Sequence, residues 1–276
     1  MAGPTNASSG RSGRLYTHPI SQETAVSVTT ILNQGIPKPA LTGWASKMAA
    51  TYAVEHIDEL RGLIKQGGES RLEALDRIKG APWRNRDNAA DRGTAVHDIG
   101  EAMGLGDLDP ADVDLSDYDD EIRGYVQSLV RWWDAFRPKV EATEVTVWSR
   151  QYQYAGTLDL IATIDLPEIE GIWPGGPARM LADYKTSKGV YGEVGLQLTA
   201  YANAEFALLD DGTEAELPPV DLGGVIHILP DGKPAKLHPI ALTDDLWSYF
   251  LYAREVADWS REGSKTAVGK PISPNR

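Results

Sequence analysis

The spacing of apolar side chains changes along the chain, from a helical period to a strand-like period near residue 140. Over 41–57, apolar residues recur at intervals of three and four, which is typical of an amphipathic helix. Trp44, Met48 and Tyr52 belong to this repeat, and we expect them in the core rather than on a base-stacking surface. Helices are predicted from residue 28, over 41–64 after a break at Pro37 and Pro39, over 70–78, around residue 97, and over 122–136.

After residue 140, apolar and polar residues alternate, as in strands with one buried face. His227 and His238 follow this alternation, and we expect them to be structural or exposed. The expected fold is α/β or α+β, a mixed central sheet flanked by helices, with a mainly helical part over 21–137 and the sheet core over 138–262. Strands are predicted over 144–149, 152–164, 180–186, 224–229 and 235–240, with a hairpin turn at 230–233 and helices over 194–209 and 243–261.

The two ends and one acidic connector carry no such pattern. Residues 1–20 are expected to be disordered and 263–276 to form a loose tail, which leaves 21–262 as a single domain. The connector 107–121 holds eight acidic residues, but no frame in it places Gly sixth and Glu twelfth, as a calcium loop requires. We interpret it as a solvated segment whose last acids favour the N-terminus of the next helix.

Composition excludes several classes of protein. The 276 residues are 42% hydrophobic and 24% charged, as in a globular protein, and they include no cysteine. The N-terminal segment lacks the apolar stretch of a secretory signal, and no apolar run is long enough to cross a bilayer. We therefore expect a cytoplasmic protein with no membrane partner.

The net charge of −13 argues against tight binding of nucleic acid over the whole surface. One local basic track lies ahead of residue 97, with Trp83 inside it. Arg84, Arg86 and Arg92 of this track are candidate nucleic-acid-binding residues, and a solvated helix end with a loop is an equally good interpretation. The other members of the track are Arg77 and Lys79.

A set of polar residues between 156 and 201 suggests a specific chemistry. Asp183 and Lys185 are two apart on a predicted strand and therefore share a face. Asp159 follows Gly156-Thr157 at the start of another strand-like run, 24 residues earlier. Carboxylates that hold divalent ions, with a lysine beside them, are suited to hydrolysis of a phosphodiester. Taken alone, Asp-x-Lys is common and is more often a solvated surface pair.

A further element lies upstream, where Thr94 is expected to cap a short helix. His97 and Glu101 are four residues apart and would lie on the same side of that helix. A neutral imidazole beside carboxylates can complete the coordination of a metal ion. By itself, His97 would more often be a packed or exposed histidine.

The ordered set Gly93-Thr94-x-x-His97, Gly156-Thr157-x-Asp159, Asp183-x-Lys185 and Gln197-x-x-x-Tyr201 resembles the PD-(D/E)XK nuclease superfamily. It is most similar to the RecB-like exonuclease branch, which includes many phage-encoded recombination nucleases. The resemblance covers roughly residues 90–205. It implies a restriction-endonuclease-like core and a Mg²⁺- or Mn²⁺-dependent DNA exonuclease that acts on linear ends in recombination or repair.

The resemblance also assigns roles to individual residues. It implies metal ligands at His97, Asp159 and Asp183 and at the backbone carbonyl of Tyr184. The catalytic set would be Lys185, Asp183 and Asp159, with Gln197 and Tyr201 lining the site. It further suggests a single-strand annealing or other recombination protein as a partner.

Two departures from the pattern matter. A related branch holds an iron–sulphur cluster through four cysteines, and the absence of cysteine here excludes that cluster. Asp183 stands where many relatives carry Glu. Three alternatives stay open: an inactive DNA-binding or assembly module of the same fold, an endonuclease, and a metal-dependent hydrolase of another phosphate ester.

Overall fold

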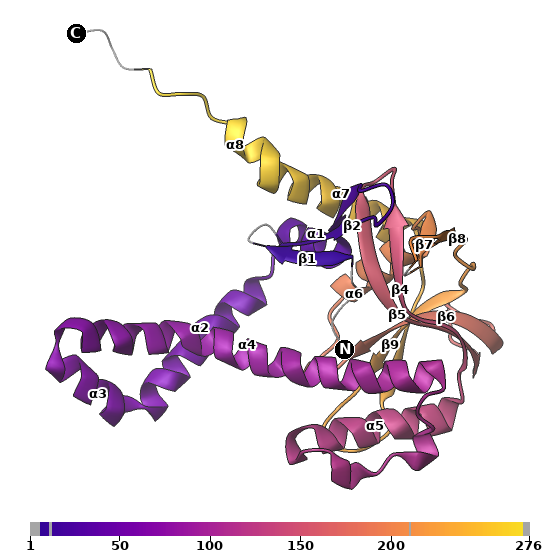
Figure 1. Cartoon of the computed structure of the whole chain (residues 1–276), viewed down its shortest axis with the longest axis horizontal. Helices are drawn as coiled ribbons and strands as arrows, with labels where there is room; N and C mark the ends of the chain where they lie inside the picture. The colour runs from indigo at the N-terminus through magenta and orange to yellow at the C-terminus, as the bar shows by residue number, and fades with distance from the viewer. Residues whose placement is uncertain (1–5, 11–12, 210, 273–276) are drawn as a thin grey trace. The chain divides into compact units, whose positions relative to one another are not determined.

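The alternating pattern after residue 138 folds into the sheet that positions the site. Our computed structural model describes residues 6–10, 13–209 and 211–272, apart from the side chains of 87–89. Ten strands of these residues form one mixed sheet (Figure 1). They are β1 (Ala7–Gly10), β2 (Gly13–Thr17), β3 (Thr24–Ser27), β4 (Lys139–Ser149), β5 (Tyr154–Leu166), β6 (Gly176–Lys185), β7 (Phe206–Leu208), β8 (Glu214–Ala215), β9 (Leu222–His227) and β10 (Lys236–Ile240).

Strand β5 is the branch point of the sheet, since it pairs with β3, β4 and β6. Strands β4, β5 and β6 are antiparallel neighbours, and β9 then runs parallel to β6 with β10 antiparallel beside it. A parallel pair needs a long crossover connection, and this one contains helix α6. The hairpin predicted between 224–229 and 235–240 is confirmed as β9 and β10.

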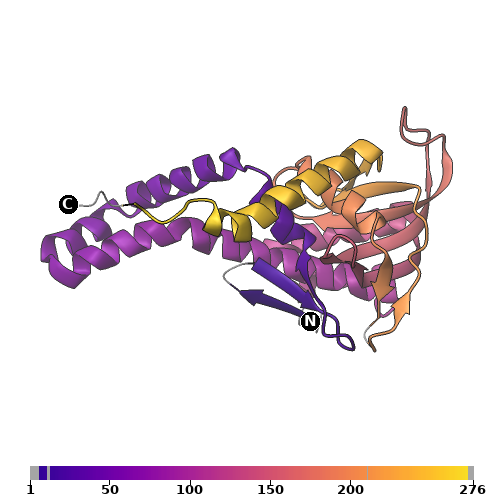
Figure 2. The same cartoon turned by 90° about the horizontal axis from the view of Figure 1, so that it is seen from above.

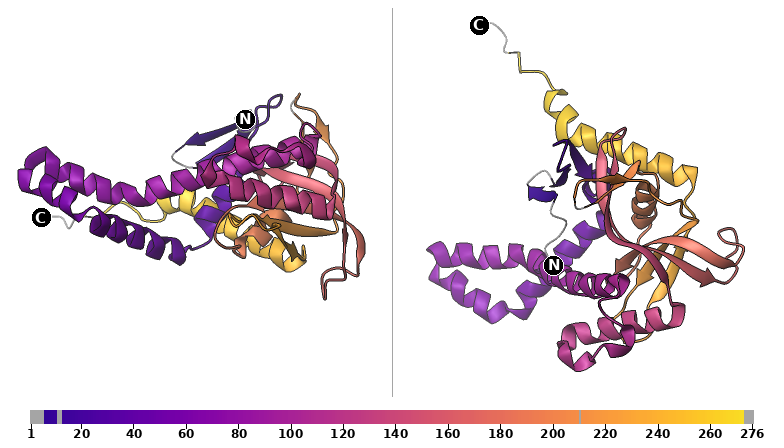
Figure 3. Two further views of the ribbon diagram at one scale, coloured as in Figure 1. Left: turned by 90° about the horizontal axis from the view of Figure 1, so that it is seen from below. Right: turned by 45° about the vertical axis from the view of Figure 1, so that its right-hand side comes forward.

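Helices cover both faces of the sheet. Residues of α5 and of the end of α4 share one core cluster with β5, β6 and β9, and Trp132 in it is fully buried. Residues of α1, α6 and α7 form a second cluster, around Phe250, with the opposite side chains of the same strands. Figure 3 shows α5 and α7 on the two sides of the sheet. The helices are α1 (Val28–Gly35), α2 (Pro39–Glu55), α3 (Ile57–Gln66), α4 (Gly68–Leu105), α5 (Asp120–Phe136), α6 (Glu193–Ala202), α7 (Asp244–Asp258) and α8 (Ser264–Thr266).

Three helix predictions need correction. The single helix expected over 41–64 is two helices, α2 and α3, which are separated at His56. The helix expected over 194–209 ends at Ala202, because 206–208 pair with β4 as strand β7. The separate helices expected near 70–78 and 97 are one helix, α4, which continues through Pro82. Proline removes a single backbone donor, and the alanines and arginines around it favour the helix. Thr94 therefore lies inside α4 and is no cap; its hydroxyl donates to the carbonyl of Ala90.

The disorder expected over residues 1–20 is wrong for the part that is described. Strands β1 and β2 pair with each other, and β2 pairs with β3. Tyr16 on β2 is 2% exposed, because it packs with Trp148 and Phe206 in a third core cluster. The Gly/Ser content of this segment therefore reflects small strand residues, not absence of structure. Residues 1–5 and 11–12 lie outside the described residues.

The connector 107–121 behaves as predicted. Asp109 and Asp114 cap two short 3₁₀ turns, and Asp120 and Glu121 lie in the first turn of α5. At the other end, α7 leads into one π-helical turn and α8, and residues 267–272 carry no helix or strand. The end of the predicted tail, 273–276, lies outside the described residues.

The chain divides into two compact units, the second of which lies within the range 21–262. We call residues 1–36 with 95–276 the sheet unit and residues 37–94 the helical unit. The helical unit contains α2, α3 and most of α4 (Figure 2). Helix α2 buries none of its residues, so the core positions expected for Trp44, Met48 and Tyr52 are wrong; these side chains are half-buried.

No helix among the described residues is both long enough and apolar enough to cross a membrane.

Candidate functional site

Strands β5 and β6 stop pairing at the positions of the two predicted aspartates. The last ladder pair is Leu160 with Ala182, and Asp159 and Asp183 lie directly beyond this pair on the two antiparallel strands. Beyond it, the N–H of Tyr184 donates to Oδ2 of Asp159 at 2.7 Å. The side-chain carboxylate thus takes the place of a ladder carbonyl, and the two strands separate around it. Both aspartates are buried, at 7% and 3% exposure.

A third acid, Glu144, lies at a gap in the neighbouring ladder. Strands β4 and β5 pair at Thr143–Leu160 and at Val145–Leu158, so Glu144 lies opposite Asp159. The φ of Glu144 is +49°, a left-handed conformation that non-glycine residues adopt at some cost. The hydroxyl of Thr143 donates to the carbonyl of Asp159 at 2.9 Å and holds the gap together.

Glu144 is not among the site residues predicted from the sequence. It could have been found only by aligning β4 with β5, because an acid at the start of a predicted strand is otherwise an ordinary exposed residue.

Helix α4 brings His97 to the same place. The ring Nε2 lies 3.0 Å from the carbonyl oxygen of Tyr184, and Nδ1 lies 3.4 Å from Oδ2 of Asp159. Close approach of the helix depends on Gly100, where an added Cβ would lie 2.7 Å from the ring of Tyr184. Ligand atoms of His97, Glu144 and Asp159 lie within 4.8 Å of one another. Glu101, predicted beside His97, is outside this group.

The tautomer of His97 tests whether a cation fits here. A carbonyl oxygen only accepts hydrogen bonds, so Nε2 of His97 carries a hydrogen and donates to Tyr184. In the neutral ring, Nδ1 then presents a lone pair to the carboxylate of Asp159. Two acceptors that face each other need a positive charge between them, from a proton or from a metal ion. The donor set, one imidazole and two carboxylates, suits a divalent cation.

On the other side of Asp159, the Asp183 carboxylate is fully engaged. Its Oδ1 accepts from the side-chain amide of Gln197 at 2.8 Å, and its Oδ2 lies 2.5 Å from Nζ of Lys185. The shared strand face predicted for Asp183 and Lys185 is confirmed by this ion pair. The amide of Gln197 also lies 3.3 Å from the hydroxyl of Tyr201.

Gly156 explains why the Gly-Thr-x-Asp motif begins with glycine. A Cβ at this position would lie 2.3 Å from the ring of Tyr201, which is itself buried. Only glycine lets α6 bring this ring, with Gln197 one turn before it, against β5. The motif glycine therefore serves the packing that supports Gln197 beneath Asp183.

The buried charges shift the protonation equilibria of the site. Burial, together with the charge of Asp159, raises the pKa of Glu144 to about 7. Burial also raises the pKa of Asp159 to about 6, with Asp183 adding to the rise and His97 opposing it. Burial alone would lower the pKa of Lys185, but the two aspartates outweigh it and the pKa is raised. The site therefore holds an ammonium group and an excess of poorly solvated negative charge.

Strand β2 adds two residues of the segment that was expected to be disordered. The hydroxyl of Tyr16 lies 2.9 Å from the hydroxyl of Thr157, two residues before Asp159. The guanidinium of Arg14 lies over the Tyr16 ring, 5.2 Å from its centroid, within reach of a cation–π interaction. No motif marks either residue, and only the pairing of β2 with β3 shows where they lie.

The predicted nucleic-acid-binding arginines belong to the helical unit. Arg84, Arg86 and Arg92 lie on the part of α4 before residue 95. The guanidinium of Arg84 lies 5.1 Å from the ring centroid of Tyr52, and Trp83 is 59% exposed. The predicted site residues and these arginines therefore belong to different compact units.

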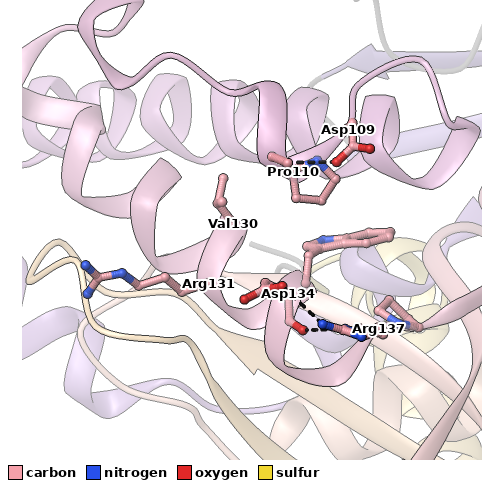
Figure 4. Close-up of a pocket in the computed structure, with 9 residues that line it drawn as sticks. Asp109, Pro110, Val130, Arg131, Asp134 and Arg137 are labelled. Carbon is pink, nitrogen blue, oxygen red and sulfur yellow. Dashed lines mark hydrogen bonds and ion pairs between the residues drawn. The ribbon is translucent and has the colours of Figure 1, made fainter.

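A separate pocket of about 590 Å³ opens between α5 and the acidic connector (Figure 4). Asp134 and Arg137 line it as a loose ion pair at 3.9 Å, and Arg131 donates to the carbonyl of Gly232. It contains none of the predicted site residues, and we assign it no role.

No model of a protein family matches the chain, and no curated protein sequence matches it either. The resemblance to PD-(D/E)XK nucleases therefore rests on the motifs alone.

Proposed function

We propose that the chain is a metal-dependent DNA exonuclease of the PD-(D/E)XK type. The observation that carries the proposal is the meeting of four distant segments: His97 of α4, Glu144 of β4, Asp159 of β5 and the Asp183–Lys185 pair of β6. The buried Asp159 and the half-buried Glu144 have raised pKa values, and such a pair of acids is costly unless a cation balances it and often marks a functional site.

His97, Glu144 and Asp159 would hold the cation, and Asp183 would join them once Lys185 turns toward substrate. When bound, Mg²⁺ or Mn²⁺ would lower the pKa of a water molecule and balance charge on the phosphate. The ligands are hard oxygen donors with one imidazole, which suits these ions.

Side chains of the protein would supply the remaining catalytic interactions. Lys185 keeps its proton, since its pKa is raised, and its Nζ is placed to orient the attacking water and to offset charge on the phosphate oxygens. Gln197 fixes the rotation of the Asp183 carboxylate, and Tyr201 supports Gln197. In the reaction, a water oxygen forms a bond to phosphorus and gives up a proton to the solvent, the bond to the leaving oxygen breaks, and that oxygen takes up a proton from the solvent.

The distribution of charge supports DNA as the substrate despite the net charge. The helical unit holds 10 of the 27 Lys and Arg residues but only 8 of the 40 Asp and Glu residues. It is therefore net basic, whereas the sheet unit is strongly acidic. We propose that the helical unit supplies the electrostatic contacts to the DNA backbone. Action in the cytoplasm, in recombination or repair beside an annealing protein, belongs to the same proposal.

One observation favours the second candidate, an inactive DNA-binding module. Asp183 is not in the group of residues whose ligand atoms lie within 4.8 Å of one another, and its two oxygens contact Lys185 and Gln197 instead. The two candidates differ in whether Lys185 releases Asp183 when substrate binds.

The test is digestion of two DNA substrates by the full chain with Mg²⁺. We expect loss of an end-labelled linear duplex while a covalently closed circle of the same sequence survives. Degradation of both would indicate an endonuclease. Survival of both with Mg²⁺ and with Mn²⁺, while the chain still retards the linear DNA in a gel, would favour the inactive module.

A further inference from the structure

A second pocket, of about 520 Å³, lies beside Lys185 on the sheet. In the ladders, Lys185 pairs with His227, and His227 pairs with Lys236. Paired residues on neighbouring strands point to the same face, so these three side chains form a row across β6, β9 and β10. Neighbouring strands are about 4.8 Å apart, which places the backbone of Lys236 about 10 Å from that of Lys185.

The charge of this pocket is opposite to that of the metal-binding cluster. Its lining includes Lys236, His227 and His238 and contains no Asp or Glu. This is notable in a chain with 40 acidic and 27 basic residues. Glu193, in the first turn of α6, is near in sequence but is not part of the lining. The pocket therefore favours an anionic ligand.

The histidines are held in place. The Nε2 of His227 donates to the carbonyl of Ser187 at 2.8 Å, which ties the loop after Lys185 to β9. His227 is 6% exposed, and its ring centroid is 5.5 Å from that of His238. The Nε2 of His238 is buried and has no hydrogen-bond partner among the described residues. A buried polar atom without a partner is costly, which a bound ligand would relieve.

The volume of the pocket and its other lining residues favour a nucleotide over a bare anion. Pockets of several hundred Å³ accommodate small organic ligands. Tyr191 lines the pocket and is 61% exposed, so its ring is free to stack on a base. Gly189 and Gly192, also in the lining, leave open space where a side chain would stand. A metal ion is disfavoured, because the lining offers imidazoles but no carboxylate.

We propose that this pocket holds the nucleotide next to the bond that is cleaved, with its phosphate on Lys236 and His238 and its base against Tyr191. The assignment rests on the proposed nuclease function and names the subsite that positions the DNA strand. Lys236 and His238 would be binding residues, and neither takes part in the chemistry.

The direct test is binding of thymidine 5′-monophosphate to the full chain without metal, followed by the ring signals of His227 and His238 in NMR spectra. We expect both rings to shift with the nucleotide, less with inorganic phosphate, and little with thymidine. Lys236→Ala should weaken nucleotide binding about tenfold, the loss expected for one charge-assisted hydrogen bond. Lys233→Ala is the matched control, since it removes an exposed lysine that pairs with Asp231 in the same hairpin.

A kinetic test separates this subsite from the nuclease function. On linear DNA, Lys236→Ala should raise KM more than it lowers kcat, and Lys233→Ala should do neither. If the intact chain cleaves DNA but the nucleotide leaves both histidine signals in place, and Lys236→Ala behaves like Lys233→Ala, the subsite is wrong. If the histidines respond to the nucleotide but the chain never cleaves DNA, the pocket stands as a nucleotide site and the nuclease proposal falls.

Discussion

The acidic cluster of Glu144, Asp159 and Asp183 and the basic cluster of His227, Lys236 and His238 lie on adjacent strands of one sheet, but they are built differently. The basic cluster follows regular ladders, in which residues paired across β9 and β10 share a face. The acidic cluster forms where pairing between β4, β5 and β6 is interrupted. Regular pairing sets side chains in rows, whereas an interrupted ladder lets several side chains converge on one point. Convergence is what a metal centre requires.

Lys185 stands between the two clusters and gives the strongest test of the comparison. Lys185→Ala should lower the cleavage rate on the order of a hundred- to a thousandfold, the loss typical when one group that stabilises the transition state is removed. Metal affinity should not fall, because His97, Glu144 and Asp159 are unaltered and the loss of Nζ frees the Asp183 carboxylate to join them. Rates on end-labelled linear DNA and Mn²⁺ titrations measure the two quantities.

Lys188→Ala is the control for charge, since Lys188 is an exposed lysine three residues later in the chain. Near-normal turnover of the Lys185→Ala protein would remove Lys185 from the mechanism. It would also remove the proposed link between the acidic and the basic cluster.

Glu144→Gln tests whether the acidic cluster is a metal site rather than a strained piece of structure. The change keeps the size of the side chain but removes a charge that faces Asp159, so we expect Mn²⁺ affinity to fall at least about tenfold. His97→Ala should act in the same direction, since it removes the imidazole from the same group. Glu170→Gln, in an exposed loop, is the control. A Mn²⁺ midpoint identical in all of these proteins would contradict the assignment.

The pH dependence of the stability of the protein tests the acidic cluster apart from the basic cluster, and it requires no substrate. Burial raises the pKa of Asp159 from 3.8 to about 6 and that of Glu144 from 4.5 to about 7. The folded chain therefore holds protons that the unfolded chain releases, and its stability falls as pH rises from about 4 to 7. For Asp159 alone the loss is on the order of 3 kcal/mol.

Thermal unfolding in EDTA between pH 4 and 8 measures this loss. Saturating Mg²⁺ should remove most of it, because a bound cation favours the ionised acids. Glu144→Gln should reduce the slope in EDTA, and Glu170→Gln should leave it unchanged. A melting temperature that is flat across this range in EDTA would show that the two acids are not held at raised pKa values.

The same difference in construction explains what could be predicted from the sequence. Alternation and turn residues were sufficient to find β4, β5, β6, β9 and β10, but not β1, β2, β3, β7 or β8. The spacing of Asp183 and Lys185 on one strand set their shared face. Glu144 could not be found, because it reaches the site at an irregular position of the β4–β5 ladder that no motif marks. Tyr16 could not be found, because its strand joins the site through β3, which pairs with β5 far along the chain. Two helices were expected where α4 forms one, because Pro82 disfavours a helix when only local propensity is considered. In the folded chain, α4 continues through Pro82.

The prediction with the smallest expected effect concerns DNA binding. It tests whether the pocket at Lys236 is enough to bind DNA or whether the helical unit is needed. Arg84→Ala with Arg86→Ala removes two of the ten basic residues of the helical unit. If both contact phosphates, the slope of log affinity against log salt should become shallower by about two. Fluorescence anisotropy of a labelled duplex with Ca²⁺, across a range of salt concentrations, measures this slope.

The control is Lys65→Ala with Arg71→Ala, which removes the same charge from the same unit outside the predicted track. A slope that changes only in the arginine pair would locate the phosphate contacts on α4 and make the helical unit the second basic region of the protein. A slope that changes equally in both pairs would indicate a diffuse field over the unit instead of a track. A slope that changes in neither would leave the pocket at Lys236 as the cationic region that meets the DNA, which sharpens the contrast between the two clusters of the sheet.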